Sequence, residues 1–516
     1  MPRLGAGRRP SARPATHRAR PRRRRKGELP EVPRTVGEDC GLGEEGGIMS
    51  PTLQASDCRF ETTDAFGWNG FATKLEGFLL GEREFVEGSL VVSLSAPFGS
   101  GKTTFFQMWK NHLDSCRGTN ADVPLCIQLN AWEDDYCGDP LLSLVDAIDR
   151  ELSERIQDPK TVSRLNSVKE ATRNLGWFMV GMANSAVSHW TGIDAVAAGE
   201  LAEVKNAKRS QKPVAPDILN LFQSRKKALG RLKVALRSLF QERKQAVFIL
   251  VDELDRCRPD FAIQYLETIK HIFDIEGFVF VIGVDLKQLE NSARAMFGDG
   301  LNFPEYFRKF AHRNIRLPIP DEAGIRNLVN KYTDRYLDDS APETPRRKSL
   351  LNLNNTRRAL TELPYDFRLT PRQILEGFRI LGHMTSVREK KSGDLYYHIA
   401  NAVIFLVFLS FLKPEKFHEF QSGKVSLARL LEIISALPIS KHREWWASVL
   451  TLSVDNCGNL KIEDIHAAFV KHGFAASEIS VEQFQKDFAR FTPDLGSWSS
   501  LGDLARRIQE VESFGK

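Results

Sequence analysis

The residues best suited to chemistry lie in two stretches, and the first is a glycine-rich loop. Gly99 and Gly101 let its backbone curl so that N–H groups converge on phosphate oxygens, and a helix that begins at the loop adds partial positive charge. Lys102 can reach terminal phosphates, and the Thr103 hydroxyl suits a magnesium ion. Ala96 stands where such loops usually have their first glycine. The predicted phosphate-binding residues are Pro97, Phe98, Gly99, Ser100, Gly101, Lys102, Thr103 and Thr104.

The second stretch, ILVDELDRCRPDF at residues 249 to 261, carries an apolar run directly into a cluster of charges. A carboxylate at the end of a buried strand is poorly solvated and needs a cation. We therefore expect Asp252 to hold Mg²⁺ through water, together with Thr103, and Glu253 to activate an attacking water as a general base. The other charges either brace the site or contact a neighbouring subunit, or they form a local salt-bridge network. These residues are Asp255, Arg256 and Arg258.

Five apolar runs predict the strands that position these residues. Helical patterns lie between them, including residues 103 to 113 after the loop. Alternating strands and helices with right-handed crossovers give a parallel, three-layer α/β core. Because ligands bind at the carboxyl ends of such strands, Lys102 and Asp252 should meet at one edge. The expected strands are Leu90–Ser95, Leu125–Asn130, Ala246–Asp252, Phe278–Val284 and Asn314–Leu317.

Three motifs resemble the KAP family of P-loop NTPases. The region around DELDRC (252 to 257) resembles the Walker B region of that family. QLNAWEDDYCGDPLL (128 to 142) is similar to its Asn-Ala-Trp segment, and EYFRKFAHRNIRLPIP (305 to 320) to the segment before its last core strand. The resemblance covers roughly residues 60 to 390 and implies ATP hydrolysis on five core strands. It suggests a soluble, bacterial-type member.

The resemblance also implies roles for residues outside the two stretches. Asp285 occupies the sensor position that reads the terminal phosphate, or it caps the helix that follows. Arg372 looks like the second sensor arginine, or it is an exposed helix arginine. Arg308 and Arg313 are candidates for an arginine finger, and the sequence does not rank them. The expected catalytic residues are Glu253, Lys102, Asp285 and Arg372.

Composition narrows the class of protein. The chain has 516 residues, of which 42% are hydrophobic and 27% charged, as is usual for a soluble globular protein with room for several domains. Its seven cysteines are odd in number and scattered, which favours reduced thiols in the cytoplasm over a zinc site or a disulfide framework. The guanine-reading Asn-Lys-x-Asp motif is absent, because the nearest stretch, NKYTD at 330 to 334, is one residue too long. ATP is therefore favoured over GTP.

The positive charge belongs to the first 48 residues. They hold 12 Lys/Arg and 6 Asp/Glu, while the remainder holds 60 of each. This Arg- and Pro-rich stretch has little to bury and is predicted to be disordered. It is a nucleic-acid or anionic-membrane arm, a flexible tail, or sequence upstream of a start at Met49.

The expected domains are residues 1–48 as a tail, 49–320 as the NTPase core and 321–516 as a helical C-terminal domain. A helical insert at about 150–240 contains LGWFMVGMANSAVSHWTGI, residues 175 to 193. One membrane span there would place Lys102 and Asp252 on opposite sides of a bilayer, so we expect a packed hairpin or an interfacial helix instead. The apolar run at 399 to 412 fits a buried core helix, because it is too short for a span.

The sequence thus predicts a cytoplasmic, Mg²⁺-dependent ATPase that acts as a nucleotide-driven switch and that forms an oligomer or binds a protein partner. The resemblance makes defence against phage or plasmids a candidate role. One alternative is a nucleic-acid-associated ATPase that uses residues 1–48. Another is a nucleotide-bound scaffold with little turnover.

Overall fold

The structure is a computed structural model of the chain. It describes residues 58–117, 123–155, 162–172, 218–240, 246–337, 348–349, 351–387, 395–423, 425–454, 460–489 and 500–514. The predicted tail, residues 1–48, and the apolar stretch 175–193 lie outside the described residues.

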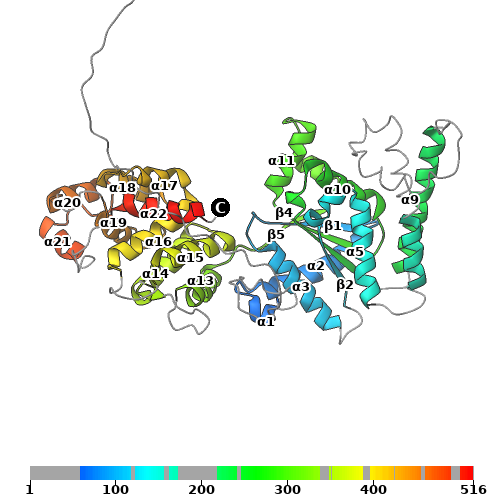
Figure 1. The fold of residues 1–516 in the computed structure, drawn as a ribbon, viewed down its shortest axis with the longest axis horizontal. Helices are drawn as coiled ribbons and strands as arrows, with labels where there is room; N and C mark the ends of the chain where they lie inside the picture. Colours follow the sequence, from blue (N-terminus) through cyan, green and yellow to red (C-terminus); the bar gives the residue numbers. More distant parts are fainter. Residues whose placement is uncertain are drawn as a thin grey trace, which may run out of the picture. The chain divides into compact units, whose positions relative to one another are not determined.

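A five-stranded sheet forms the centre of the NTPase core (Figure 1), and its neighbouring strands are all parallel. The order is β2-β3-β4-β1-β5, so β4 lies between the strand that enters the glycine-rich loop and the strand that ends in carboxylates. All five predicted strands are confirmed, with ends within one residue of the expected ones. They are β1 (Leu90–Ser95), β2 (Leu125–Asn130), β3 (Val247–Asp252), β4 (Phe278–Val284) and β5 (Arg313–Arg316).

Helices cover both faces of this sheet, which explains why β1, β3 and β4 are buried along their whole length. Along β1, Leu90, Val92 and Leu94 belong to the core under α2 and α3, whereas Val91 faces the core of α5, α9 and α10. Successive strand side chains point to opposite faces, so one apolar run supplies both cores. The helices of this region are α1 (Phe60–Thr63), α2 (Trp68–Glu82), α3 (Lys102–Arg117), α4 (Ala131–Asp134), α5 (Pro140–Arg155), α9 (Ile218–Phe240), α10 (Pro259–Ile272), α11 (Leu286–Phe297) and α12 (Phe303–Phe307).

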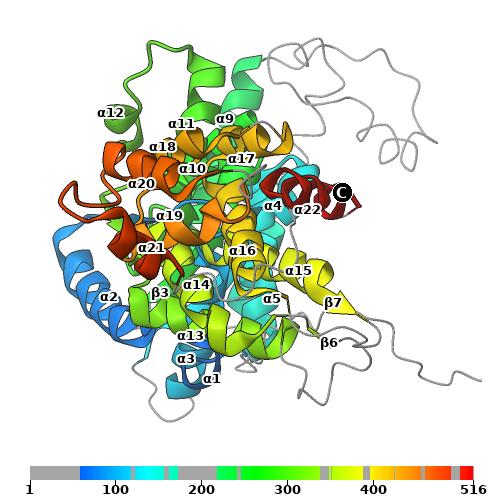
Figure 2. The same ribbon diagram turned by 90° about the vertical axis from the view of Figure 1, so that its left-hand side faces the viewer.

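The region after residue 320 is helical, as predicted, apart from one short antiparallel pair of strands. Its most buried helix is α16, which corresponds to the apolar run at 399 to 412 and is confirmed as a core helix. It contacts α14, α15, α17, α19 and α22, and Figure 2 shows it among these helices. The elements are α13 (Glu322–Tyr336), β6 (Lys348–Ser349), α14 (Leu353–Asp366), α15 (Pro371–Thr385), β7 (Ser386–Val387), α16 (Tyr397–Leu412), α17 (Pro414–Gln421), α18 (Leu427–Ala436), α19 (Arg443–Thr451), α20 (Ile462–Lys471), α21 (Val481–Ala489) and α22 (Leu501–Phe514).

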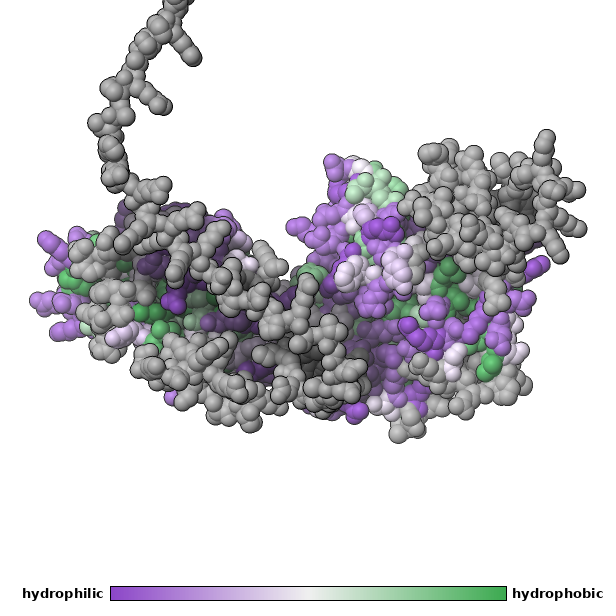
Figure 3. Space-filling view, in the orientation of Figure 1, coloured by the Kyte–Doolittle hydropathy of each residue, from purple (hydrophilic) through white to green (hydrophobic). Residues whose placement is uncertain are grey.

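The described surface is largely hydrophilic on the face drawn in Figure 3, with hydrophobic residues in small groups. Of the insert, the described parts are helical: the end of α5, residues 162–172 and α9. Among the described residues, none of the helices combines the length and the apolar character needed to cross a bilayer.

Candidate functional site

The glycine-rich loop connects β1 to α3, and its two glycines are required by geometry. Gly99 and Gly101 have φ values of 80° and 93°, in the left-handed region that favours glycine. A Cβ atom on Gly99 would lie 2.8 Å from Cβ of Arg372, and one on Gly101 would lie 3.0 Å from the ring of Trp68. A side chain at either position would therefore both strain the backbone and displace a neighbour.

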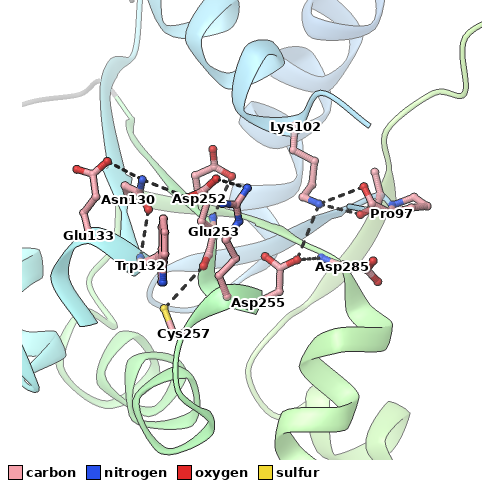
Figure 4. Close-up of polar contacts among 12 residues, drawn as sticks. Pro97, Lys102, Asn130, Trp132, Glu133, Asp252, Glu253, Asp255, Cys257 and Asp285 are labelled. Carbon is pink, nitrogen blue, oxygen red and sulfur yellow. Dashed lines mark hydrogen bonds and ion pairs between the residues drawn. The ribbon is translucent and has the colours of Figure 1, made fainter. Parts of the chain in front are cut away.

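Lys102, the first residue of α3, points back over the loop (Figure 4). Its Nζ donates to the carbonyl oxygens of Ala96 at 2.8 Å and Pro97 at 3.5 Å, and it lies 4.0 Å from Oδ2 of Asp255. The lysine side chain is 8% exposed and that of Asp255 is 4% exposed. A buried ammonium that is held by neutral carbonyls and one carboxylate is suited to exchange these partners for phosphate oxygens.

Asp252 ends β3 and is the most strongly perturbed carboxyl group of the site. Burial raises its pKa to about 6, which the neighbouring Thr103 side chain partly opposes. Its Oδ1 accepts the Glu253 backbone N–H at 3.0 Å. Its Oδ2 is buried and has no well-aligned hydrogen-bond partner among the described residues. This oxygen is the kind of group that a cation satisfies.

The residues fit a magnesium ion that arrives with a nucleotide. Mg²⁺ keeps several waters and is usually bound by one or two carboxylates together with substrate phosphates. Thr103 and Asp252 supply a hydroxyl and an unsatisfied carboxylate oxygen side by side. Across the described ranges, no group of three or more His, Cys, Asp or Glu side chains could hold a metal by itself. The donor set is thus typical of a shared protein–phosphate site.

Glu253 follows Asp252 with a backbone that is rare for a side-chain-bearing residue. Its φ is 59°, a conformation that costs about 1–2 kcal/mol for an L-residue. Its carboxylate accepts from Nδ2 of Asn130 at 3.3 Å and pairs with Arg256 at 2.7 Å. Asn130 ends β2 directly opposite Asp252 in the sheet, and Figure 4 shows it beside Glu253. Strain at this position is compatible with a side chain placed for chemistry.

Asp285, at the end of β4, links the loop to the carboxylate cluster. Its Oδ1 accepts the Lys287 N–H at 3.1 Å, which caps α11, and its Oδ2 accepts the Phe98 N–H at 3.2 Å. Its own N–H donates to Asp255 at 2.9 Å. The cap is therefore present, and the carboxylate also holds the glycine-rich loop. A role in reading a terminal phosphate stays a prediction.

Arg372 comes to the site on the first turn of α15. This helix has Thr370 as N-cap, whose side chain accepts the Gln373 N–H, and the Thr370 N–H donates in return to the Gln373 side chain at 2.9 Å. The Arg372 N–H donates to the Gly99 carbonyl at 3.3 Å. Its guanidinium lies 4.9 Å from the centre of the Phe98 ring. Arg372 therefore contacts the glycine-rich loop through both its backbone and its side chain.

The three charges left open after the Asp-Glu pair form a local network. Asp255 accepts from Asp285 and faces Lys102. Arg256 pairs with Glu253. Arg258 binds Asp135 through its backbone N–H and through Nε, both at 3.0 Å, and so ties the segment after β2 to the segment after β3.

One cavity of about 270 Å³ brings both predicted stretches together. Pro97 and Ser100 do not line it, although they belong to the predicted loop. Sequence reasoning missed two lining residues, Tyr332 and Leu375, and the partner of Glu253, Asn130. Asn130 could have been found, because it ends a predicted strand and begins the Asn-Ala-Trp motif. The lining residues are Phe98, Gly99, Gly101, Lys102, Thr103, Thr104, Asp252, Glu253, Asp255, Arg256, Tyr332, Pro371, Arg372 and Leu375.

The two candidate finger arginines differ in their contacts. Arg313 pairs with Glu82 of α2 at 2.7 Å. Arg308 is exposed at the end of α12. Arg313 is paired in the sheet with Val92, which is near the start of β1, whereas the glycine-rich loop follows the end of β1. Arg313 is therefore the first residue of β5, at the opposite end of the sheet from the cavity, and Arg308 precedes that strand.

Comparison with known proteins identifies one family. The model of the KAP family P-loop domain matches residues 79–388. A search among curated proteins finds no match.

Among solved structures, the Aeropyrum pernix ORC2 protein in its ADPNP–ADP complexes is 12% identical, with 87% of this chain and 95% of that chain covered and a TM-score of 0.33. C. elegans PCH-2 is 11% identical, with 71% and 74% covered and a TM-score of 0.29. Drosophila ORC bound to GC-rich DNA and Cdc6 is 11% identical, with 93% and 78% covered and a TM-score of 0.31. These scores are too low to bear on fold or activity.

Proposed function

The chain belongs to the KAP family of P-loop proteins, and from this premise we propose that it binds ATP with Mg²⁺ and hydrolyses it. The observation that carries the proposal is the shared cavity. Phosphate-binding groups at the end of β1 and the carboxylates at the end of β3 line the same space. Phosphoryl transfer needs both sets, since it depends on positioning and on charge stabilisation.

In the proposed reaction the loop amides and Lys102 bind the terminal phosphates. Magnesium held by Thr103 and Asp252 would neutralise charge on the phosphate oxygens. Glu253 accepts a proton from water as the water oxygen bonds to the γ-phosphorus. The bond from that phosphorus to the bridging oxygen breaks, which releases ADP and phosphate. Arg372 and Asp285 are proposed to contact the terminal phosphate and to hold the loop.

The test is phosphate release from ATP by the full-length chain, with Mg²⁺ and with a chelator. We expect Mg²⁺-dependent release that is lost in Lys102→Ala, and release from ATP in preference to GTP. Lys110→Ala is the matched control, because Lys110 lies on the same helix but pairs with Asp114 and Glu151. Equal release from Lys102→Ala and the wild-type chain would reject the proposal.

A scaffold that binds nucleotide with little turnover is the second candidate, and one observation favours it. In the structure Glu253 accepts from Asn130 and pairs with Arg256, so a water must compete with two donors for its carboxylate oxygens. Tight binding of labelled ATP without phosphate release would favour the scaffold over the ATPase.

Each part of the proposed biological role is supported by a single observation. A nucleotide-driven switch is supported by the bond between Arg372 and Gly99, which connects the glycine-rich loop to α15. The cysteine pattern supports action in the cytoplasm. The family resemblance supports a role in bacterial defence and the formation of an oligomer. Use of residues 1–48 as a nucleic-acid arm predicts salt-dependent DNA binding that disappears when they are removed.

A further inference from the structure

Arg256 occupies an unusual position for a charged residue of the site. It ends the short turn Leu254–Arg256, and its Nη2 lies 2.7 Å from Oε1 of Glu253. Its guanidinium carbon lies 4.6 Å from the centre of the Phe98 ring and 5.4 Å from that of the Trp132 ring. Phe98 belongs to the glycine-rich loop and Trp132 to α4 after β2. The guanidinium therefore contacts aromatic rings from two other strand ends.

These contacts do more than stabilise a surface ion pair. An exposed pair between flexible side chains contributes little, but a guanidinium against aromatic rings gains a cation–π attraction as well. Arg256 is 31% exposed and Glu253 is 14% exposed, and both line the cavity with Lys102 and Thr103. The guanidinium thus lies in the space that phosphate must enter.

The charged side chains that line the cavity affect how a phosphate can bind beside Glu253. Three carboxylates line it, and the terminal phosphate of ATP would bring further negative charge beside Glu253. Two negative groups in one cavity repel each other unless a cation lies between them. Of the three cations that line the cavity, Arg256 is the one paired with Glu253 in the described structure. Its five N–H donors can bind a carboxylate or a phosphate with similar geometry.

We propose that Arg256 reads the terminal phosphate of the nucleotide. When ATP binds, the guanidinium moves from the Glu253 carboxylate to the γ-phosphate, and Glu253 becomes available to the attacking water. ADP lacks that phosphate, so the pair between Arg256 and Glu253 stays intact. Arg256 is then a catalytic residue that also distinguishes ATP from ADP. This inference rests on the proposed ATP-binding function.

The primary test is the ratio of two dissociation constants. Full-length protein is titrated, with Mg²⁺, with ADP and with an ATP analogue whose β–γ bridge is an imido group. In Arg256→Gln we expect the preference for the analogue over ADP to fall about tenfold, as expected for the loss of a charge-assisted contact. ADP affinity should stay within about twofold, because ADP does not reach the guanidinium.

Arg258→Gln is the matched control. It removes an arginine two positions away that is bound to Asp135 and has no place in the cavity lining. Its preference for the analogue should equal that of the wild-type chain. An equal loss of preference in both variants would show that the whole turn, and not Arg256, determines selectivity.

Fluorescence gives a second readout, because the guanidinium lies against Trp132 and should leave it on binding. The analogue should change tryptophan emission and ADP should not, and the change should be absent in Trp132→Phe.

An unchanged preference in folded Arg256→Gln overturns the inference. If that variant does not fold, Arg256→Lys is judged by the same criterion, since it keeps the charge but not the planar fork. A wild-type chain that binds neither nucleotide contradicts the proposed function instead.

Discussion

The ends of β1 and β3 carry opposite kinds of residue, glycines at one and carboxylates at the other, although the two strands are alike in length and burial. Both are six-residue strands that are buried throughout, and only β4 separates them. After β1 the chain removes side chains, since a Cβ on Gly99 would meet Arg372 and one on Gly101 would meet Trp68. At the end of β3 the chain adds carboxylates: Glu253 and Asp255 have partners, whereas Oδ2 of Asp252 has no well-aligned one among the described residues. We propose that the first end binds an anion and that the second holds a cation and accepts a proton.

Hydrogen bonds at the end of β4, the strand between β1 and β3, connect the ends of those two strands. Asp285 follows β4, accepts the Phe98 N–H from the glycine-rich loop and donates its own N–H to Asp255. A change at one end can therefore reach the other through three hydrogen-bonded residues. The comparison predicts that changes after β1 mainly affect binding, whereas changes after β3 mainly affect catalysis and charge.

The largest expected effect is on catalysis at the β3 end. Glu253→Gln keeps the size of the side chain and removes the base, so phosphate release should fall by roughly 10² to 10⁴ while ATP still binds. Labelled-ATP binding and phosphate release are measured on the same preparation. Near-normal turnover would exclude Glu253 as the base, and loss of binding would show that the two ends do not act separately.

At the β1 end, Lys102→Ala should weaken binding itself. Loss of charge-assisted bonds to phosphate costs about 1.5–3 kcal/mol, which corresponds to roughly 10- to 150-fold in the dissociation constant. Asp252→Ala should resemble it, but raised Mg²⁺ should partly restore binding only in the Asp252 variant. The same response to Mg²⁺ in both variants would contradict separate roles for lysine and carboxylate.

A pair of glycine substitutions tests whether close approach matters beyond backbone strain. Gly99→Ala and Gly138→Ala both place alanine at positive φ, 80° and 70°, at a cost of about 1–2 kcal/mol each. Of the two, only Gly99 has atoms within 4 Å of the added Cβ, and the nearest is Cβ of Arg372 at 2.8 Å. We therefore expect Gly99→Ala to lose about 1–3 kcal/mol more in denaturant unfolding. Equal losses would show that the contact with α15 is easily displaced.

The smallest expected effect is a gain in stability at Asp252. Its pKa is raised from 3.8 to about 6, so its protonated form stabilises the fold below pH 4 and this contribution is lost as the pH rises through about 6. Asp252→Asn mimics the protonated form and should raise the free energy of unfolding by about 1–2 kcal/mol at pH 8.

Denaturant unfolding of both proteins at pH 8 and pH 5 checks this. The gain should shrink by about 1 kcal/mol at pH 5, where the wild-type carboxyl group is itself mostly protonated. A gain that does not depend on pH would mean that burial of this carboxylate does not limit stability.

Much of the site could be predicted because its signals are local. The glycine-rich loop and the strand that ends at Asp252 each depend on residues within one turn or one strand. Backbone preferences and hydrophobic periods act over such distances and can be recognised in a single sequence.

The partners of the charged residues could not be predicted in the same way. Asn130 reaches Glu253 and Asp135 reaches Arg258 across 123 residues of sequence, and Phe98 reaches Asp285 across 187. Each contact depends on which strand ends are neighbours, and hence on the order β2-β3-β4-β1-β5. Apolar runs do not encode that order, because all five strands can pair with one another through the same backbone groups.

By itself, then, the sequence determined the residue types of the site and the local backbone that presents them. Only the tertiary structure decided that Arg256 lies against the rings of Phe98 and Trp132 and that Arg372 contacts Gly99. The physical reason is that side-chain charges act over a few ångströms, and the groups within that range were selected by sheet order and helix packing rather than by their spacing along the chain.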